Sequence, residues 1–351
     1  MKAKTLVAVL MLLLPLTAAA WETGDLRLRG RLQTRFEAEE KNDGGWTSAF
    51  RLRRARFDGC WLPAEGVRLV LEIEGASLLE MENADTPYTE LKDAYGRIEF
   101  DKALRVQVGH FKKPFSRLKM MSPFELFLPA RGMLNRHAVA RTAHGGYGGR
   151  DVGVMLSGRF KELARFRYFL GAFSGMGLQD GLEESHKDFV GRLQVRPFEG
   201  LRVAVNAAHK LYHDHAKETH NTANLFGADL RYKIEGFTLL LEGAYGDNVD
   251  AGPGHILWGV HGTAAYELSL SDTLALIPAV MVEVFDPDDQ VDGGRTLRIA
   301  GAINLDISEI CRVILFVEGA GGDMQAYDRV EAAVRRREVP TRVMVQVNMA
   351  F

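Results

Sequence analysis

The sequence predicts an all-β fold: a transmembrane, 16-stranded antiparallel β-barrel with a long inward-folding loop. Three observations predict it: an export-type N-terminal segment, the lack of any later long apolar stretch, and sixteen segments in which apolar and polar residues alternate. The mean hydropathy of −0.11 is too polar for a bundle of membrane helices. A chain of 351 residues is long enough for one large barrel.

The first twenty residues have the composition of a secretory signal. Two lysines precede an apolar run from Leu6 to Leu16, and alanines occupy 18–20. This run is too short to cross a bilayer core of about 30 Å as a helix. We therefore expect an exported protein in which 1–20 form a signal peptide and 21–351 form a single barrel domain. No later segment has 18 consecutive apolar residues, so any membrane crossing would use strands.

Period-two alternation recurs along the rest of the chain, as expected for strands with one face to lipid and one to the lumen. In the first predicted strand, Leu26 to Phe36, every second residue is apolar or small and most of those between are arginines. The total is sixteen, an even number, as in single-chain bacterial barrels. The other predicted strands are 49–61, 66–76, 90–100, 103–113, 150–159, 164–173, 187–197, 201–211, 223–234, 237–246, 257–268, 273–284, 295–305, 311–319 and 341–351.

The predicted connections alternate between long and short. Barrels of this class have short periplasmic turns and longer extracellular loops, whereas a soluble sandwich has no reason to show this alternation. The even-to-odd connections, such as 101–102 and 235–236, run from two to about five residues. The odd-to-even connections are all predicted to have ten residues or more: 37–48, 77–89, 114–149, 174–186, 212–222, 247–256, 285–294 and 320–340.

The last predicted strand distinguishes an exported soluble protein from a membrane barrel. From Val343 to Phe351 every second residue is apolar, and the sequence ends on the aromatic. This pattern resembles the signal by which outer-membrane barrels are handed to the barrel assembly machinery. We therefore expect Phe351 to act as an assembly signal and outer-membrane lipid to surround the barrel. The alternative is the last strand of a soluble β-sandwich.

The overall charge argues against a nucleic-acid partner. Lys plus Arg is 44 and Asp plus Glu is 46, which gives a formal charge of −2 and no basic bias. Cys60 and Cys311 show no metal-ligand spacing, and the predicted strand order keeps them too far apart for a disulfide. The sequence predicts no cofactor or metal. It also predicts no enzyme, because Ser157 and Ser174 have no His and acid placed beside them.

Two polar loops are weaker candidates for metal binding. The His-x-His sequence His213 to His215 could bind a transition metal, although an exposed polar loop is the favoured interpretation. The aspartates from Asp286 to Asp292 suggest a calcium loop, but no glutamate follows at the twelfth position of an EF-hand. A hairpin turn is favoured there.

Several motifs resemble the phosphate-selective porins of the O/P type. They are the arginine-rich segment Arg51–Phe57, Leu91–Tyr95, Val108–Phe115, Glu283–Asp289 and Arg298–Leu305. The most specific is Gly-His-Phe-Lys-Lys-Pro-Phe within Val108–Phe115. The resemblance implies a sixteen-stranded, usually trimeric channel in the outer membrane of a Gram-negative bacterium, for phosphate or larger phosphate oligomers. This chain is shorter than the family's best-studied members and has few of the loop lysines that gather anions at the channel mouth.

An anion entering a narrow pore loses hydration, and arginine supplies planar, bidentate replacement donors. The chain has 31 Arg and only 13 Lys. Alternation of side chains along the strands places several arginines on one wall of the lumen. Arg56 joins them only if Arg53-Arg54 forms a bulge. The alternative is that Glu72 and Glu74 beside this wall, or Glu242 and Glu283 opposite, neutralise it. The predicted anion-binding residues on the wall are Arg27, Arg29, Arg31, Arg35, Arg51, Arg53, Arg56, Arg97 and Arg105.

The longest connection, 114–149, is the natural candidate for a loop that folds into the barrel and narrows it. Its basic residues outnumber its single acid, Glu125, and include the predicted anion-binding residues Arg131, Arg136 and Arg141. With a basic loop facing a basic wall, the channel would prefer small inorganic anions. The alternative position for the loop is the outer surface.

The functional expectation is an anion-preferring outer-membrane porin, with phosphate or polyphosphate uptake as the role that the resemblance implies. Homotrimer formation is implied by the resemblance alone. Two alternatives stay open: a general diffusion porin without phosphate specificity, and a barrel that acts as a sleeve for a partner protein. Conductance of the purified barrel favours a porin, whereas a copurifying stoichiometric polypeptide favours the sleeve.

Overall fold

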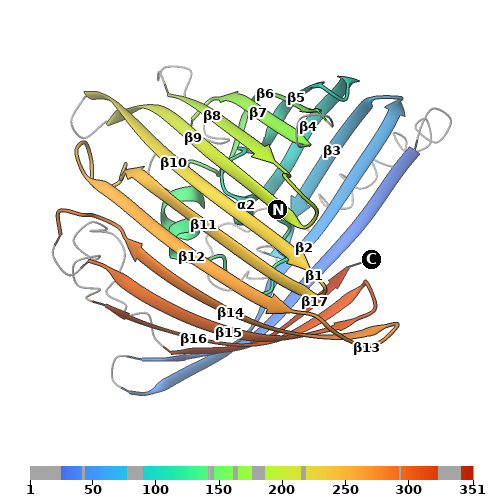
Figure 1. Ribbon diagram of the computed structural model, residues 1–351, viewed down its shortest axis with the longest axis vertical. Coiled ribbons are helices and arrows are strands. Elements are labelled where there is room, and N and C mark those ends of the chain that lie inside the picture. The colour runs from blue at the N-terminus through green and yellow to red at the C-terminus, as the bar shows by residue number, and fades with distance from the viewer. Residues whose placement is uncertain are drawn as a thin grey trace, which may run out of the picture.

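The computed structural model of the protein describes residues 25–41, 44–76, 90–140, 142, 146–160, 165–175, 186–214, 219–291, 294–322 and 341–350. Within these residues the chain forms one antiparallel sheet that closes on itself (Figure 1). The predicted signal peptide 1–20, Arg141, His215 and Phe351 lie outside the described residues.

The sheet closes because β1 pairs with both β2 and β17. The short β13 follows β12, and both pair with β14, so the wall is sixteen strands around with one additional strand. The strands are β1 (Asp25–Glu40), β2 (Trp46–Ala64), β3 (Val67–Glu74), β4 (Glu90–Asp101), β5 (Leu104–Lys112), β6 (Arg150–Phe160), β7 (Phe166–Phe173), β8 (Lys187–Val195), β9 (Leu201–Asp214), β10 (Thr219–Ile234), β11 (Phe237–Asp247), β12 (Ile256–Tyr266), β13 (Leu268–Ser271), β14 (Leu274–Asp286), β15 (Thr296–Ile307), β16 (Cys311–Gly322) and β17 (Arg342–Ala350).

The sixteen predicted strands and the barrel are confirmed, but four connections predicted to have ten residues or more are shorter: 41–45, 215–218, 248–255 and 287–295. The β1–β2 and β9–β10 hairpins extend until Glu40 pairs with Trp46 and Asp214 pairs with Thr219, which leaves connections of only 41–45 and 215–218. About ten tilted residues suffice to cross a bilayer, so the extra residues carry these hairpins beyond it. Outside the membrane these strands carry polar side chains, a composition that is also typical of loops. The sequence analysis therefore made these strands too short.

Alternation along each strand separates an apolar outer surface from a polar interior. On β15, Leu297, Ile299 and Ile303 are exposed, whereas the intervening Arg298 and Asn304 are buried inside the barrel. The same pattern recurs on other strands, including β6 and β16. An apolar surface that runs right around the barrel suits the hydrocarbon of a membrane. Within the described residues, no helix is both long and apolar enough to span a bilayer.

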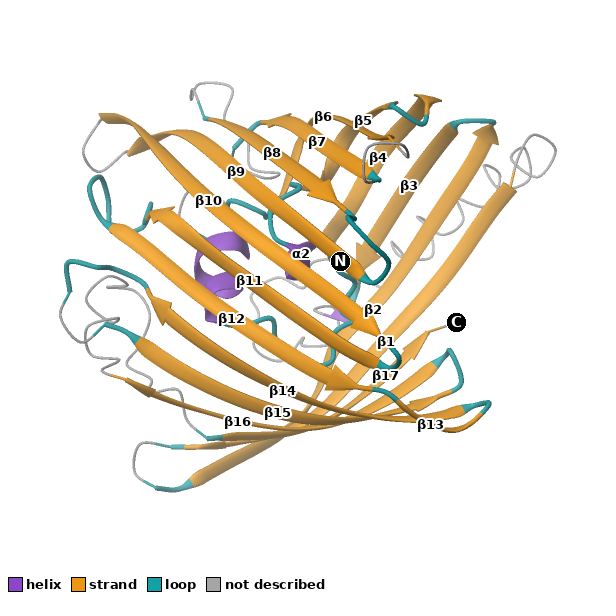
Figure 2. Cartoon of the chain, viewed as in Figure 1, coloured by secondary structure: helices purple, strands orange, loops and turns teal. Residues whose placement is uncertain are grey.

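The described residues of the segment 113–149 fold into the barrel, as predicted, and the alternative surface position is wrong. It contains α2 (Arg117–Met120) and the π-helix η2 (Asn135–Ala140), which lie within the ring of strands (Figure 2). We call this segment the inner loop. Its apolar residues fill one side of the lumen by packing on lumen-facing residues of the wall. The largest cluster includes Phe115, Leu134, Val139, Leu225, Leu257 and Phe285.

The two cysteines are free, as predicted. Cys60 lies on β2 directly opposite Arg27 and Val70, on the lumen face. Cys311 lies on β16 opposite Met349, whose side chain is exposed on the outer surface. The strands β1 and β17 separate β2 from β16, so the strand order keeps the two thiols apart.

Packing of the inner loop predicts a separation between loop stability and barrel stability. Leu134→Ala removes a fully buried side chain, which should cost about 2–5 kcal/mol locally. The sheet hydrogen bonds are untouched, so the variant should keep heat-modifiable gel migration while its single-channel conductance and current noise increase. The exposed Leu297→Ala serves as control. Conductance identical to wild type in folded Leu134→Ala would contradict this role of the loop.

Candidate functional site

Carboxylates on the far wall hold the inner loop by its backbone. Glu242 accepts hydrogen bonds from the Ser116 hydroxyl at 2.5 Å and the Leu118 amide at 3.1 Å. Glu283 accepts from the amides of Met133 and Leu134 at 2.8 and 3.0 Å. Both carboxylates keep their negative charge in these hydrogen bonds. Glu283 also pairs with Arg298 at 3.2 Å, and the charge of Glu242 acts on Arg131, so the sequence alternative that these acids offset arginine charge stays open.

Gly132 allows this approach. Its φ is +98°, and a Cβ placed on it would lie 2.5 Å from Oε1 of Glu283. Any side chain here would meet the carboxylate, and a positive φ is in any case costly for residues other than glycine. A glycine directly before the two donating amides is therefore needed for Glu283 to reach them.

Ion pairs and side-chain donors fix the rest of the loop to β8–β16. Arg117 pairs with the buried Asp229 at 2.7 Å, and Arg192 bonds to the same carboxylate. Lys113, where the loop begins, pairs with Asp188. Arg312 of β16 donates to the carbonyls of 124 and 126. Asp229 offsets only part of the charge of Arg117, because Arg117 and Arg192 share this one carboxylate.

Arg131 keeps its charge. Its Nε donates to the carbonyl of Leu118 at 2.6 Å and its Nη2 to that of Met121 at 2.9 Å. Burial, followed by the positive charges of Arg56 and Arg150, lowers the pKa of Arg131 to about 10, so it is still protonated at neutral pH. Carbonyls orient the guanidinium without cancelling it. Arg131 therefore contributes a full positive charge on the side of the loop that faces β2.

The loop also touches the arginine wall. Arg31 lies over the Phe124 ring at 5.7 Å and donates to the Ser122 hydroxyl at 3.4 Å. The inner loop therefore bridges the lumen between the wall that anchors it and the wall that carries the arginines.

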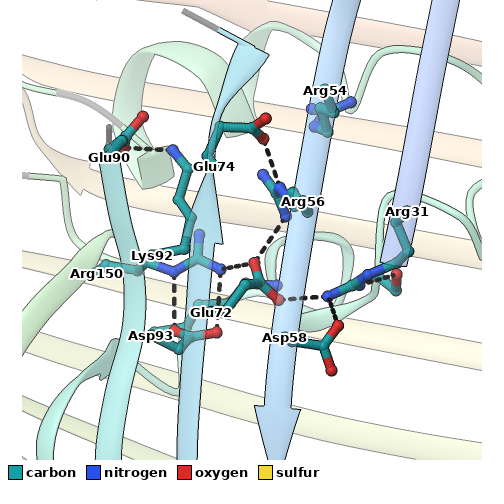
Figure 3. Close-up of polar contacts among 12 residues, drawn as sticks. Arg31, Arg54, Arg56, Asp58, Glu72, Glu74, Glu90, Lys92, Asp93 and Arg150 are labelled. Carbon is teal, nitrogen blue, oxygen red and sulfur yellow. Dashed lines mark hydrogen bonds and ion pairs between the residues drawn. The ribbon is translucent and has the colours of Figure 1, made fainter. Parts of the chain in front are cut away.

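Much of the arginine wall is an ion-pair network (Figure 3). Arg31 bonds to Asp58 at 2.7 Å and to Glu72 at 2.5 Å, and Arg56 bonds to Glu72 at 3.0 Å and to Glu74 at 2.7 Å. Glu72 also accepts from Arg150, which pairs with Asp93. The sequence alternative that Glu72 and Glu74 neutralise part of the wall is confirmed for these arginines.

A bulge in β2 leaves further arginines outside this network. Gln33 pairs with Arg54 and Thr34 with Leu52, so Arg53 is the extra residue. The bulge restores register, and Arg56 lies opposite Arg31 on the lumen face, as the bulge hypothesis predicted. Arg54 is buried and donates to the Gln33 side chain, and Arg53 is exposed. In the described part of the chain, no carboxylate lies within ion-pair distance of Arg53, Arg54 or Arg131.

Arg54 was missed by sequence reasoning. The signal was present, since the bulge was placed at Arg53-Arg54 to bring Arg56 inward. A bulge of this kind turns two consecutive side chains toward the same face. That second consequence assigns Arg54 to the lumen as well.

The remaining predicted arginines differ in how far they are neutralised. Arg27 pairs with Asp25 at 3.6 Å and Arg29 with Asp58 at 2.8 Å. Arg35 and Arg51 share Glu37, and Arg35 also donates to Gln346. The others lie nearer the short turns or on the inner loop: Arg105 pairs with Glu99, Arg97 donates to Gln107, and Arg136 is exposed on η2.

The histidines add no clear site. Burial, followed by the charge of Arg136, lowers the pKa of His137 to about 4, so it is neutral at pH 7. The rings of His213 and His220 lie 4.8 Å apart. Across the residues that the structure describes, no group of three or more His, Cys, Asp or Glu side chains is arranged to hold a metal ion.

A closed sixteen-stranded barrel with an apolar outer surface and a loop folded into a polar lumen defines a β-barrel porin. A family model described as phosphate-selective porin O and P matches residues 26–236, more than half of the chain. The chain therefore belongs to this family, whose members are channel-forming proteins of the Gram-negative outer membrane. A search of curated proteins finds no match.

Solved structures share the fold at low sequence identity. The anion-selective porin from Comamonas acidovorans is 14% identical, with a TM-score of 0.69 over 93% of this chain and 100% of that one. Salmonella typhi OmpF in complex with daunomycin is 9% identical, with a TM-score of 0.66 over 94% and 98%. The DcaP channel of Acinetobacter baumannii is 12% identical, with a TM-score of 0.59 over 94% and 98%.

The network predicts that removing a shared acid increases anion preference. Glu72→Gln keeps the side-chain shape but removes the negative charge that Arg31, Arg56 and Arg150 share. The chloride-over-potassium permeability ratio, measured from reversal potentials in a KCl gradient, should rise. Glu309→Gln, in an exposed short turn, provides a control with the same net change. A folded Glu72→Gln channel with an unchanged ratio would show that this network does not face the permeation path.

Proposed function

We propose that the protein is a porin whose channel prefers anions, and that it is not an enzyme. The observation that carries the proposal is the surplus of positive charge where β1 and β2 face the inner loop. We infer that solutes pass there, and we call this region the passage. Arg53, Arg54 and Arg131 have no carboxylate within ion-pair distance among the described residues, and Arg54 and Arg131 are held by neutral acceptors. Guanidinium groups there replace hydration for anions and repel cations.

The family supports phosphate or phosphate oligomers as the permeating anions. Arginine is suited to this, because its planar fork makes two charge-assisted hydrogen bonds to a phosphate. The anion-selective neighbour supports the sign of the preference. A second candidate is a general anion-preferring porin without phosphate specificity, favoured by the scarcity of lysine in the loops. A sleeve for a partner protein is disfavoured, since the inner loop fills one side of the lumen.

The assembly we propose is a homotrimer in the outer membrane. Support comes from the family resemblance and from a solved neighbour, OmpT of Vibrio cholerae, described in a trimer form. Residues 1–20 would direct export and Phe351 would be read by the barrel assembly machinery. The lumen described above lies within one chain, so the proposed anion preference is a property of each barrel.

The direct test is the reversal potential of single-residue variants in a KCl gradient. Arg53→Gln and Arg54→Gln each remove an unpaired charge, so we expect the chloride preference of wild type to fall in both and further in the double variant. Lys41→Gln, in the exposed β1–β2 loop, controls for the loss of one charge. The wild-type preference should be steep in dilute salt and fade toward 1 M, because the Debye length shortens from about 10 Å at 0.1 M to about 3 Å.

A cation-selective wild-type channel would contradict the proposed function outright. Unchanged selectivity in the folded double variant would remove these arginines from the permeation path. The two substrate candidates separate when phosphate is added to the same recordings. Phosphate block of chloride current that weakens in Arg54→Gln supports a phosphate channel, whereas no block in wild type supports a general anion-preferring porin.

A further inference from the structure

A second set of arginines lies in the lumen near the short turns. We call them the turn-end arginines, and of these sequence analysis singled out only Arg97. They are close to the turns 65–66, 102–103, 161–165, 196–200 and 235–236, at the opposite end of the barrel from the long loops. Their register and alternation place them on the lumen face. They are Arg68, Arg97, Arg159, Arg167, Arg202 and Arg231.

These arginines form cross-strand pairs with each other. Arg159 of β6 is directly opposite Arg167 of β7, and Arg202 of β9 is directly opposite Arg231 of β10. Arg68 and Arg97 form a third such pair. Directly opposite residues have their Cβ atoms about 4.5–5.5 Å apart, and like charges in such positions destabilise a sheet.

No carboxylate within the described residues forms an ion pair with these arginines, although Glu99 acts on Arg97 and Arg159, and Glu125 on Arg231, at longer range. Glu99 is bound by Arg105 at 2.6 Å, and Glu199 pairs with Arg196 at 3.6 Å while almost fully exposed. None of the turn-end arginines has an acid within ion-pair distance in that part of the chain. Nε of Arg159 is buried and has no hydrogen-bond partner there. The ionised groups that act on Arg167 are Arg202, Arg105 and Arg159, all positive.

The spacing of the pairs sets the kind of ligand. Arg167 on β7 and Arg202 on β9 are separated by β8 alone. Two strand spacings amount to about 10 Å, and a register offset of two residues adds about 7 Å along the strands, so the two backbone positions lie about 12 Å apart. Arginine side chains can close much of that distance from both sides. An anion with several negative groups can therefore neutralise both pairs at once, whereas a monovalent anion can contact only one.

We propose that the pairs Arg159–Arg167 and Arg202–Arg231 form a binding site for a polyvalent anion at the short-turn end of the lumen. This site is distinct from the passage bordered by Arg53, Arg54 and Arg131. It goes beyond the proposed function, resting on it only in that the lumen must be open to solutes. Its chemistry fits a polyphosphate or a polycarboxylate equally, since both present several oxyanions.

The test is calorimetric titration of the folded, detergent-solubilised barrel at low salt. Inorganic tripolyphosphate is the probe, and the Arg53→Gln/Arg54→Gln background removes charge from the passage. We expect tripolyphosphate to bind the Arg53→Gln/Arg54→Gln protein. Adding Arg202→Gln and Arg231→Gln to that protein should weaken its affinity for tripolyphosphate at least tenfold. The matched Lys pair, Arg202→Lys/Arg231→Lys, should retain most of the affinity. Lys102→Gln/Arg165→Gln removes two exposed charges at the same end and should have little effect.

Two results would overturn the proposal. The first is a folded Arg202→Gln/Arg231→Gln variant that binds tripolyphosphate as tightly as the background does. The second is a Lys102→Gln/Arg165→Gln control that loses as much affinity as this variant, which would mean that only diffuse charge attraction acts. Citrate titrated in the same way distinguishes carboxylate from phosphate chemistry. These outcomes are separate from the proposed function, because a cation-selective channel with an intact tripolyphosphate site would refute the anion preference alone. Heat-modifiable migration verifies folding of every variant.

Discussion

Attachment of the inner loop to one wall by buried carboxylates determines where the lumen remains open. Glu242 and Glu283 accept the loop's hydroxyl and amide hydrogens, and Asp229 holds Arg117. If these buried polar groups lacked hydrogen-bond partners, each would lower the stability of the fold by about 1–3 kcal/mol. Apolar packing of Phe115 and Leu134 adds to the attachment. With the loop committed to this side, the passage is left beside β1 and β2.

Ion pairing determines how much of the arginine charge remains. Glu283 pairs with Arg298 on the far wall, and Glu72 is shared among three guanidinium groups. What remains around the passage is positive, because the β2 bulge adds Arg54 and the loop adds Arg131, each held by neutral acceptors. A selective channel here thus depends on which carboxylates are used elsewhere, rather than on the number of arginines.

Sequence patterning predicted all sixteen wall strands, because lipid on one face and water on the other impose a period of two. It also predicted the inward loop from its length and charge. The pairing of individual charges could not be predicted, since it depends on register and on contacts distant in sequence, such as Glu283 with Met133. The bulge hypothesis placed Arg56 correctly yet missed Arg54. The turn-end pairs such as Arg202–Arg231 become visible only when the ladders are known.

The central claim, that the lumen is electropositive, is tested most directly by the reactivity of Cys60. This thiol faces the lumen opposite Arg27, and Cys311→Ser makes it the single cysteine. A positive potential concentrates anions and depletes cations. An anionic methanethiosulfonate should therefore modify Cys60 several-fold faster than a cationic one of similar size, after correction for their rates with a free thiol, and the ratio should approach one in 1 M salt. An equal or inverted ratio in dilute salt would contradict the account.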